Sequence, residues 1–155
     1  MLKGIAASQG IAVAKAYKLV QPVLDIQKKD ADSEEELKKL DAAFKKTVAD
    51  IEHIKEVASK HLKEEELAIF DAHLMMANDP DFRSMIEDEI KNNKENAEFA
   101  AKTVSDNMVA MFEAMDDEYM KGRAADIKDV SFRLQCNLAG KEIPNLSTLD
   151  QPVII

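Results

Sequence analysis

The sequence predicts a mainly α-helical fold: a bundle of two antiparallel helical hairpins with a short β-strand stub at each end. Hydrophobic residues make up 46% of the 155 and charged residues 33%, which suits a domain with a packed core rather than a disordered chain. Aromatic residues are only 5% and Trp is absent, so the material of an all-β sandwich or barrel is missing. Over long stretches, apolar residues recur at steps of three and four, the spacing of one helix face.

The first 20 residues are predicted to be extended. From residue 10 to residue 20, apolar side chains occupy both alternating faces, which is typical of a strand inside a sheet covered on both sides. We therefore expect residues 1–20 to be the N-terminal strand segment of an incomplete α/β domain. Residues 21–32, which have mixed charges, are predicted to be a linker.

The next segment, residues 33–62, is predicted to form one long amphipathic helix. Ser33 and Glu36 fit a capping box, and apolar residues follow at helical spacing from Leu37 to Leu62. At about 1.5 Å per residue this helix would be roughly 45 Å long. A surface of similar length must cover its apolar stripe.

Two short helices are predicted over residues 64–93, joined by a corner at Asp79-Pro80. Asp79 can cap a helix, and Pro80 suits the first helical position because it lacks an N–H that needs a partner.

Two further helices complete the predicted helical domain of residues 33–140. One begins at Asn96, and the other is capped by Asp116 or Asp117 and ends at Gly140. The short connections indicate antiparallel neighbours and hence two hairpins packed as a bundle.

The last segment, residues 141–155, is predicted to be a return linker and a strand stub. It ends in Pro152-Val153-Ile154-Ile155, whose β-branched residues resemble the beginning of a buried strand. This segment and the N-terminal strand are predicted to belong to a β-sheet whose other strands are not among the 155 residues. We therefore expect the sequence to be a fragment.

The acidic charge narrows the classes of partner. Lys and Arg total 21 and Asp and Glu total 30, so the formal net charge is −9. Phosphate-rich nucleic acid and anionic membrane surfaces would be repelled, which leaves basic proteins or a metal as attractions. One cysteine agrees with a reducing compartment, and no apolar run is long enough to span a membrane. These features predict a cytoplasmic location without membrane insertion.

Catalytic and metal sites find little support in the sequence. It contains no Gly-rich phosphate loop, and His53, His61 and His73 lack a nucleophile partner. Cys136 is interpreted as a small packed side chain. Glu66 and Asp71 stand near His73, but the spacing is not that of a metal site, so a structural or interface role for this histidine is favoured.

One stretch, residues 64–81, combines acidic and apolar character. It holds six acidic residues and no Lys or Arg, and it contains the insert Leu74-Met75-Met76-Ala77. The acids could be a solvated face and the methionines core, or the stretch could be an adaptable docking patch that attracts a basic partner. Composition alone leaves both interpretations open. Tyr119 and Arg123 are four residues apart and therefore lie on one ridge of the predicted helix. Ion pairing along the helix does not explain this placement.

Three motifs, in order along the chain, resemble Enzyme I of the bacterial phosphotransferase system, the phosphoenolpyruvate-protein phosphotransferases. They are Gly4-Ile-Ala-Ala-Ser-Gln-Gly-Ile-Ala12, then Ala68-Ile-Phe-Asp-Ala-His-Leu-Met-Met76 with Asp79, and Asp117-Glu-Tyr-Met-Lys-Gly-Arg-Ala-Ala-Asp-Ile-Lys-Asp129. The resemblance covers essentially the whole chain.

The resemblance implies a function. In that family, phosphoenolpyruvate phosphorylates a histidine, which passes the group to a histidine of the small carrier HPr, and a helical insertion docks HPr. The family's Gly-Gly-x-Thr-Ser-His type motif is absent from these residues, so the resemblance implies a docking module that is catalytically inactive alone. No cofactor is expected here, and magnesium is implied only for the full-length parent.

The resemblance also implies twelve docking residues, from the acidic start of residues 64–81 to the last helix. They are Glu64, Glu65, Ala68, His73, Met75, Met76, Asp79, Asp81, Phe82, Phe112, Tyr119 and Arg123. No residue is assigned a catalytic or metal-binding role.

The chain departs from the family pattern at a few positions. Gln9 replaces the usual Pro, Gly122 stands where Glu is common, and Ser131-Phe132 replaces a small-basic pair. Two alternatives remain: a nitrogen- or dihydroxyacetone-branch paralogue with a different carrier, or a phosphate-accepting fragment that uses His73.

Overall fold

The computed structural model describes residues 10–144 and 151–154. The chain divides into two compact units, one made of Met1–Gln21 with Pro144–Ile155 and the other of Pro22–Ile143. Most of the first motif of the resemblance, up to residue 9, lies outside the described residues, as does Ile155.

The first unit contains the two strands. β1 (Lys15–Ala16) pairs in parallel with β2 (Val153–Ile154), and the amide of Tyr17 donates to the carbonyl of Ile154 at 2.8 Å. A strand at each end was predicted, but β1 is much shorter than the predicted extended segment. The covering of both faces stays a prediction, because it belongs to the incomplete α/β domain; within the described residues Ile11 is 97% exposed.

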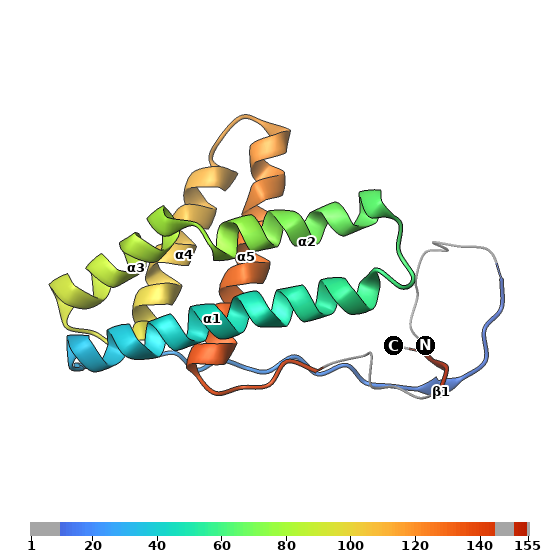
Figure 1. Ribbon diagram of the computed structural model, residues 1–155, viewed down its shortest axis with the longest axis horizontal. Helices are drawn as coiled ribbons and strands as arrows, with labels where there is room; N and C mark the ends of the chain where they lie inside the picture. Colours follow the sequence, from blue (N-terminus) through green and yellow to red (C-terminus); the bar gives the residue numbers. More distant parts are fainter. Residues whose placement is uncertain (1–9, 145–150, 155) are drawn as a thin grey trace. The chain divides into compact units, whose positions relative to one another are not determined.

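The second unit is entirely helical in its regular structure. Its helices are α1 (Ser33–Ala58), α2 (Glu64–Ala77), α3 (Pro80–Asn93), α4 (Ala97–Glu113) and α5 (Glu118–Leu138). In Figure 1, α2 and α3 follow one another back along α1, while α4 and α5 form a second hairpin that crosses it steeply. The mainly α fold built from two hairpins, predicted from the sequence, is confirmed.

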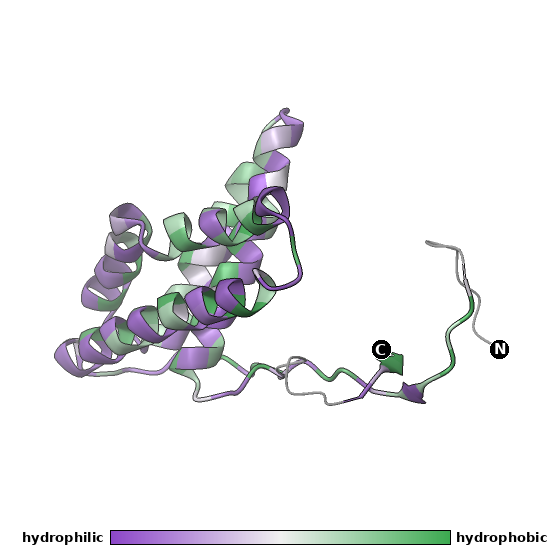
Figure 2. Ribbon diagram, turned by 45° about the vertical axis from the view of Figure 1, so that its right-hand side comes forward, coloured by the Kyte–Doolittle hydropathy of each residue, from purple (hydrophilic) through white to green (hydrophobic). Residues whose placement is uncertain are grey.

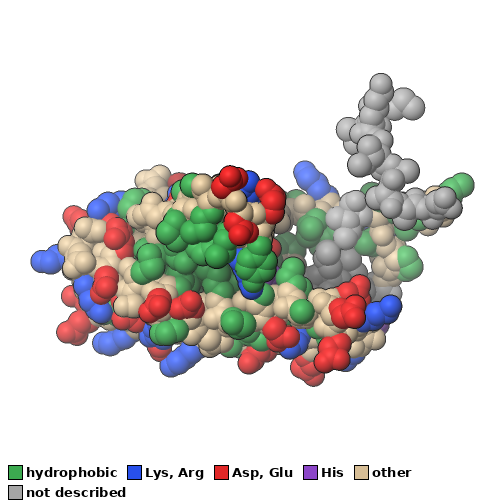
Figure 3. All heavy atoms as spheres, turned by 90° about the horizontal axis from the view of Figure 1, so that it is seen from above, with side chains coloured by type: hydrophobic (Ala, Val, Ile, Leu, Met, Phe, Trp, Pro, Cys, Tyr) green, Lys and Arg blue, Asp and Glu red, His purple; other side chains and the backbone are tan. Residues whose placement is uncertain are grey.

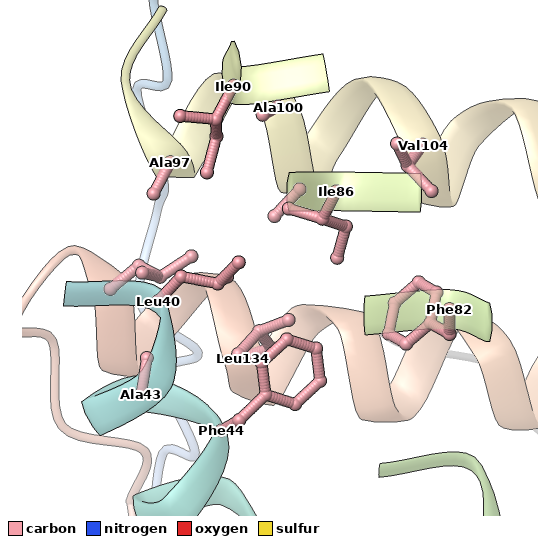
Figure 4. Close-up of a cluster of buried hydrophobic side chains, with 12 residues drawn as sticks. Leu40, Ala43, Phe44, Phe82, Ile86, Ile90, Ala97, Ala100, Val104 and Leu134 are labelled. Atoms are coloured by element: carbon pink, nitrogen blue, oxygen red, sulfur yellow. The ribbon is translucent and has the colours of Figure 1, made fainter. Parts of the chain in front are cut away.

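The main hydrophobic core lies where α1, α3, α4 and α5 meet. Leu40 and Phe44 of α1 face Ile86 and Phe82 of α3, with Leu134 of α5 beside them (Figure 4). The rings of Phe44 and Phe82 meet edge to face, with centroids 6.0 Å apart. A second, smaller cluster holds residues of α1, α2 and α5. The helices carry both hydrophobic and hydrophilic residues along their turns, as amphipathic helices do (Figure 2).

The start and end of α1 differ from the prediction. Asp32, one residue before Ser33, is the N-cap, and its carboxylate accepts from the amides of the second and third helical residues. The predicted capping box is wrong because Glu36 is used elsewhere: its carboxylate accepts from the amide of Ala97 at 2.7 Å and so caps α4. At the other end α1 stops at Ala58 and does not reach Leu62.

The remaining helix ends follow local chemistry. Asp79 caps α3 with Pro80 at its first turn, and Asp117 caps α5. At the end of α5, Gly140 adopts φ +64°, and the amide of Lys141 donates to the carbonyl of Cys136 at 2.8 Å. This is a Schellman arrangement, in which a left-handed glycine lets the chain satisfy the last carbonyls of the helix.

A short strap holds the linker before α1 to the start of α4. The amide of Ala31 donates to the carbonyl of Lys94, and the Lys28 ammonium lies 2.8 Å from Oε2 of Glu95. Glu95 is only 1% exposed, and contact with its carboxylate raises the pKa of Lys28. The other oxygen of this carboxylate has no hydrogen-bond partner among the described residues. The strap therefore contains a buried charge that depends on one lysine.

Candidate functional site

A groove of about 340 Å³ lies between the α2–α3 corner and the α4–α5 hairpin. We call it the methionine groove. Hydrophobic side chains gather in one area of this side of the molecule, with Asp and Glu around its edges (Figure 3). The residues that line the groove are Ala72, Met75, Met76, Asp79, Phe82, Met108, Phe112, Tyr119, Met120, Arg123, Asp126 and Ile127.

The first wall of the groove comes from α2 and the corner after it. Met76 packs against both hydrophobic clusters, whereas its neighbour Met75 is 75% exposed. Phe82 has the opposite character, because its ring is part of the main core. Asp79 is fixed at the corner by its capping bonds to the amides of Asp81 and Phe82. The wall thus offers one free thioether side chain on a rigid base.

The opposite wall carries a stacked pair on α5. A guanidinium nitrogen of Arg123 donates to the hydroxyl of Tyr119 at 2.7 Å, and the guanidinium carbon lies 5.1 Å from the ring centre. The hydrogen bond to Tyr119 raises the pKa of Arg123, so the side chain is a permanent cation. The pair explains why these two residues occupy one ridge: each holds the other in place.

Asp126 connects the two walls. Its Oδ2 accepts from Arg123 at 3.3 Å, and its Oδ1 lies 3.4 Å from Nε2 of His73 on α2. The histidine contact falls outside hydrogen-bond geometry, and Nε2 is buried without a hydrogen-bond partner among the described residues. An Nε2 atom enclosed in this way is poorly placed to accept a phosphoryl group.

Acidic side chains extend from the groove along α2. Glu64 and Glu65 occupy its exposed first turn, and steps of three and four carry the same helix face through Ala68 to Met75. Within the described ranges, neither glutamate has an ion-pair partner, whereas Asp71 is paired with Lys55. The start of α2 therefore carries two exposed acidic side chains without an ion-pair partner among the described residues.

The structure brings together seven of the twelve predicted residues. Met75, Met76, Asp79, Phe82, Phe112, Tyr119 and Arg123 all line the groove. His73 lies behind it against Asp126, while Glu64, Glu65, Ala68 and Asp81 are exposed residues outside its lining. Whether they bind a partner stays a prediction.

Five lining residues were missed by the sequence analysis: Ala72, Met108, Met120, Asp126 and Ile127. Asp126 could have been found, because it continues the ridge of Tyr119 and Arg123 by three residues. Met108 and Met120 could not, since their stripes fit a core as well as a groove.

Two negative findings bear on the chemistry. In the part of the chain that the structure describes, no group of three or more His, Cys, Asp or Glu residues could hold a metal ion. Likewise, none of the helices of the described residues is both long and apolar enough to cross a membrane.

Comparison with known sequences gives a consistent result. The family described as PEP-utilising enzyme, N-terminal, matches residues 3–123. Phosphoenolpyruvate-protein phosphotransferases of Listeria monocytogenes and of Bacillus subtilis are each 48% identical over 155 aligned residues, which cover 99% of this chain. The chain spans only 27% of the length of either relative.

Solved structures agree in fold. A solution structure of an Enzyme I protein matches with a TM-score of 0.90 and 39% identity, covering 99% of this chain and 63% of that one. A structure described as the N-terminal domain of Enzyme 1, nitrogen, matches with a TM-score of 0.69 and 25% identity over 75% of this chain and 49% of that one.

Proposed function

The chain belongs to the family of N-terminal regions of PEP-utilising enzymes, and from this premise we propose that it is the HPr-docking region of an Enzyme I. In this proposal residues 33–140 bind HPr so that the histidine of HPr can receive phosphate from a phosphohistidine outside these 155 residues. The transfer takes place in the cytoplasm and serves sugar uptake. The greater similarity to the Enzyme I structure than to the nitrogen-branch structure favours HPr over another carrier.

The observation that carries the proposal is the methionine groove. Seven residues that the family resemblance assigns to docking line one cavity, although they come from four different helices and the corner between two of them. Its combination of flexible methionines with the Tyr119–Arg123 stack is typical of protein-binding surfaces, where aromatic residues and Arg are enriched.

Charge supports a basic partner. Glu64 and Glu65 add negative charge at the first turn of α2, and within the described residues no cation compensates them. An acidic approach to an apolar groove would steer a basic carrier and then bury its apolar contacts. The −9 net charge of the chain acts in the same direction at long range.

The proposed contribution is positioning rather than chemistry. Holding the carrier histidine beside a phosphohistidine converts a bimolecular transfer into a local one. The chain lacks the phosphoacceptor motif, and we propose that it transfers no phosphate by itself. Magnesium would act on the phosphoenolpyruvate site of a full-length parent, and the described residues offer no cluster suited to hold it.

A charge-reversal pair tests the docking surface. Glu64→Lys with Glu65→Lys should weaken HPr binding about tenfold or more, because attraction becomes repulsion at the approach to the groove. Glu34→Lys with Glu35→Lys is the matched control: it makes the same charge change in the exposed first turn of another helix. Binding would be followed by amide chemical shifts during titration with HPr.

The titration separates the outcomes clearly. We expect shifts concentrated around the methionine groove and a loss of affinity that is much larger in the α2 variant than in the α1 control. Spectra that do not change at high HPr concentration would refute HPr docking altogether. Equal losses of HPr affinity in the two variants would show that only the net charge of the chain matters. The interface would then not lie at the start of α2.

A further inference from the structure

Met75 is the most exposed of the described methionines, and it belongs to the proposed docking surface. The residue is 75% exposed, compared with 52% for Met111 on α4 and 46% for Met85 on α3. Met75 lines the methionine groove, whereas Met85 and Met111 do not. Accessibility to solvent and position in the groove therefore coincide at this one thioether.

The other groove methionines are shielded. Met76 and Met108 pack against the main core, and Met120 is only partly exposed. An oxidant in solution therefore reaches Met75 before the rest of the groove. The structural role of Met75 is also slight, since it belongs to neither hydrophobic cluster. Its modification would alter the groove surface without disturbing the fold.

We propose that Met75 is a site of reversible oxidation by hydroperoxides and that its oxidation weakens docking of the partner. The inference rests on the proposed function, because it concerns regulation of the same groove. In the reaction, the thioether sulfur attacks the terminal oxygen of hydrogen peroxide, the O–O bond breaks, and methionine sulfoxide and water are formed. Sulfur is oxidised by two electrons and the peroxide is reduced by two.

The physical consequence follows from polarity. A sulfoxide replaces an apolar, flexible contact by a polar, chiral group. Burying that group against apolar groove residues without a hydrogen-bond partner costs roughly 1–3 kcal/mol, which corresponds to a loss of affinity of at least about fivefold. Sulfoxide reductases restore the thioether, so the change would be a switch rather than damage.

The experiment treats the 155-residue chain with graded hydrogen peroxide and measures two quantities. Peptide mass mapping gives the order in which methionines gain oxygen, and titration with HPr gives the affinity before and after treatment. Met75→Leu and Met85→Leu are compared with the wild type, each variant against its own untreated affinity. Circular dichroism checks that helix content is retained.

We expect Met75 to be oxidised first among the methionines that the structure describes, and the wild type to lose affinity at least about fivefold on treatment. Met85→Leu should lose as much, while Met75→Leu should keep its own untreated affinity. Earlier oxidation of Met85 or Met111, or an oxidised wild type that binds like the untreated protein, would overturn the inference. Failure of the untreated wild type to bind HPr would instead refute the proposed function, and with it this regulation of docking.

Discussion

Nε2 of His73 lies 3.4 Å from Oδ1 of Asp126, a contact that joins α2 to α5 behind the methionine groove. The other oxygen of the same carboxylate accepts from Arg123 at the surface of the groove. One acidic side chain thus contacts two half-buried residues, the histidine of α2 and the cation of α5, and so lies between the two walls of the groove.

Asp126→Ala should therefore loosen the groove. We expect a loss of stability of about 1 kcal/mol and a several-fold weaker HPr affinity, because Arg123 loses one of its two acceptors and keeps only the hydroxyl of Tyr119. Denaturant unfolding and an HPr titration measure the two effects. Asp129→Ala, at an exposed site on the same helix, is the control and should leave both unchanged. Identical affinities in the two variants would contradict a positioning role for Asp126.

Salt should weaken carrier binding. Raising the ionic strength from about 0.05 M to about 0.5 M shortens the Debye length from about 14 Å to about 4 Å, so steering by Glu64 and Glu65 is screened. We expect the HPr dissociation constant to rise several-fold, mainly through slower association, which stopped-flow kinetics can measure. An association rate insensitive to salt would exclude electrostatic steering.

Alanine substitutions at the glycine inside α5 and at the glycine that follows α5 should change the stability of the fold in opposite directions. Gly122 lies inside α5, and an added Cβ would meet nothing within 4 Å, so Gly122→Ala should stabilise the fold by about 1 kcal/mol. Gly140 has φ +64°, where alanine is strained, so Gly140→Ala should destabilise by about 1–2 kcal/mol. Thermal unfolding compares them. Shifts of the same sign would contradict this account of the two backbones.

The hydrogen bonds of Arg83 to two carboxylates should make the stability of the fold depend on pH. Arg83 donates to Glu87 at 2.8 Å and to Asp41 at 3.0 Å. The pKa of Glu87 is lowered by its hydrogen bond from Arg83, and the pKa of Asp41 by bonds from Lys45 and then from Arg83. Carboxyls with lowered pKa values stabilise the fold above their ordinary values of 4.5 and 3.8, and this contribution is lost as pH falls through the lowered values.

Arg83→Met should reduce the loss of folding stability that occurs as the pH falls. Urea unfolding between about pH 6 and about pH 3 should give a smaller loss of stability for the variant than for the wild type. Since these side chains are partly exposed, the difference should be modest and should shrink in high salt. Parallel pH profiles for the two proteins would show that Arg83 does not set these pKa values.

The strap gives a prediction about buried charge. Lys28→Met should lower the melting temperature, because Glu95 would remain buried without its cation. Adding Glu95→Met should recover much of the loss, since a buried pair can be replaced by apolar side chains. Lys29→Met is the neighbouring control. A double variant no more stable than Lys28→Met would contradict this interpretation.

Local chemistry made much of the fold predictable. Asp79 and Pro80 specify a helix start by their own capacities to cap and to begin a helix, and the structure has that corner where the sequence indicated it. The predicted capping box at Ser33 failed because Asp32 could cap equally well. The carboxylate of Glu36 instead accepts from the amide of Ala97, 61 residues further along the chain, and a local sequence pattern cannot predict such a contact.

The candidate site was predictable in part. The composition of residues 64–81 and the family resemblance both indicated a docking surface, yet Ala72, Met120, Asp126 and Ile127 were missed although they lie within the motifs. The sequence predicted that Met75 and Tyr119 serve one surface, but not that they line one groove, because this depends on how the two hairpins cross. The contact between His73 and Asp126 was likewise invisible: the residues stand on different helices, and burial of the histidine comes from packing. Their part in carrier binding stays a prediction.

The division of the chain into two units has a practical consequence. Every residue that lines the methionine groove, and the strap and the Schellman turn as well, falls within Pro22–Ile143. The residues that form the groove therefore all come from one unit of the chain. A protein engineer could treat this segment as a portable adaptor and graft it between the strands of an unrelated host to recruit a carrier there.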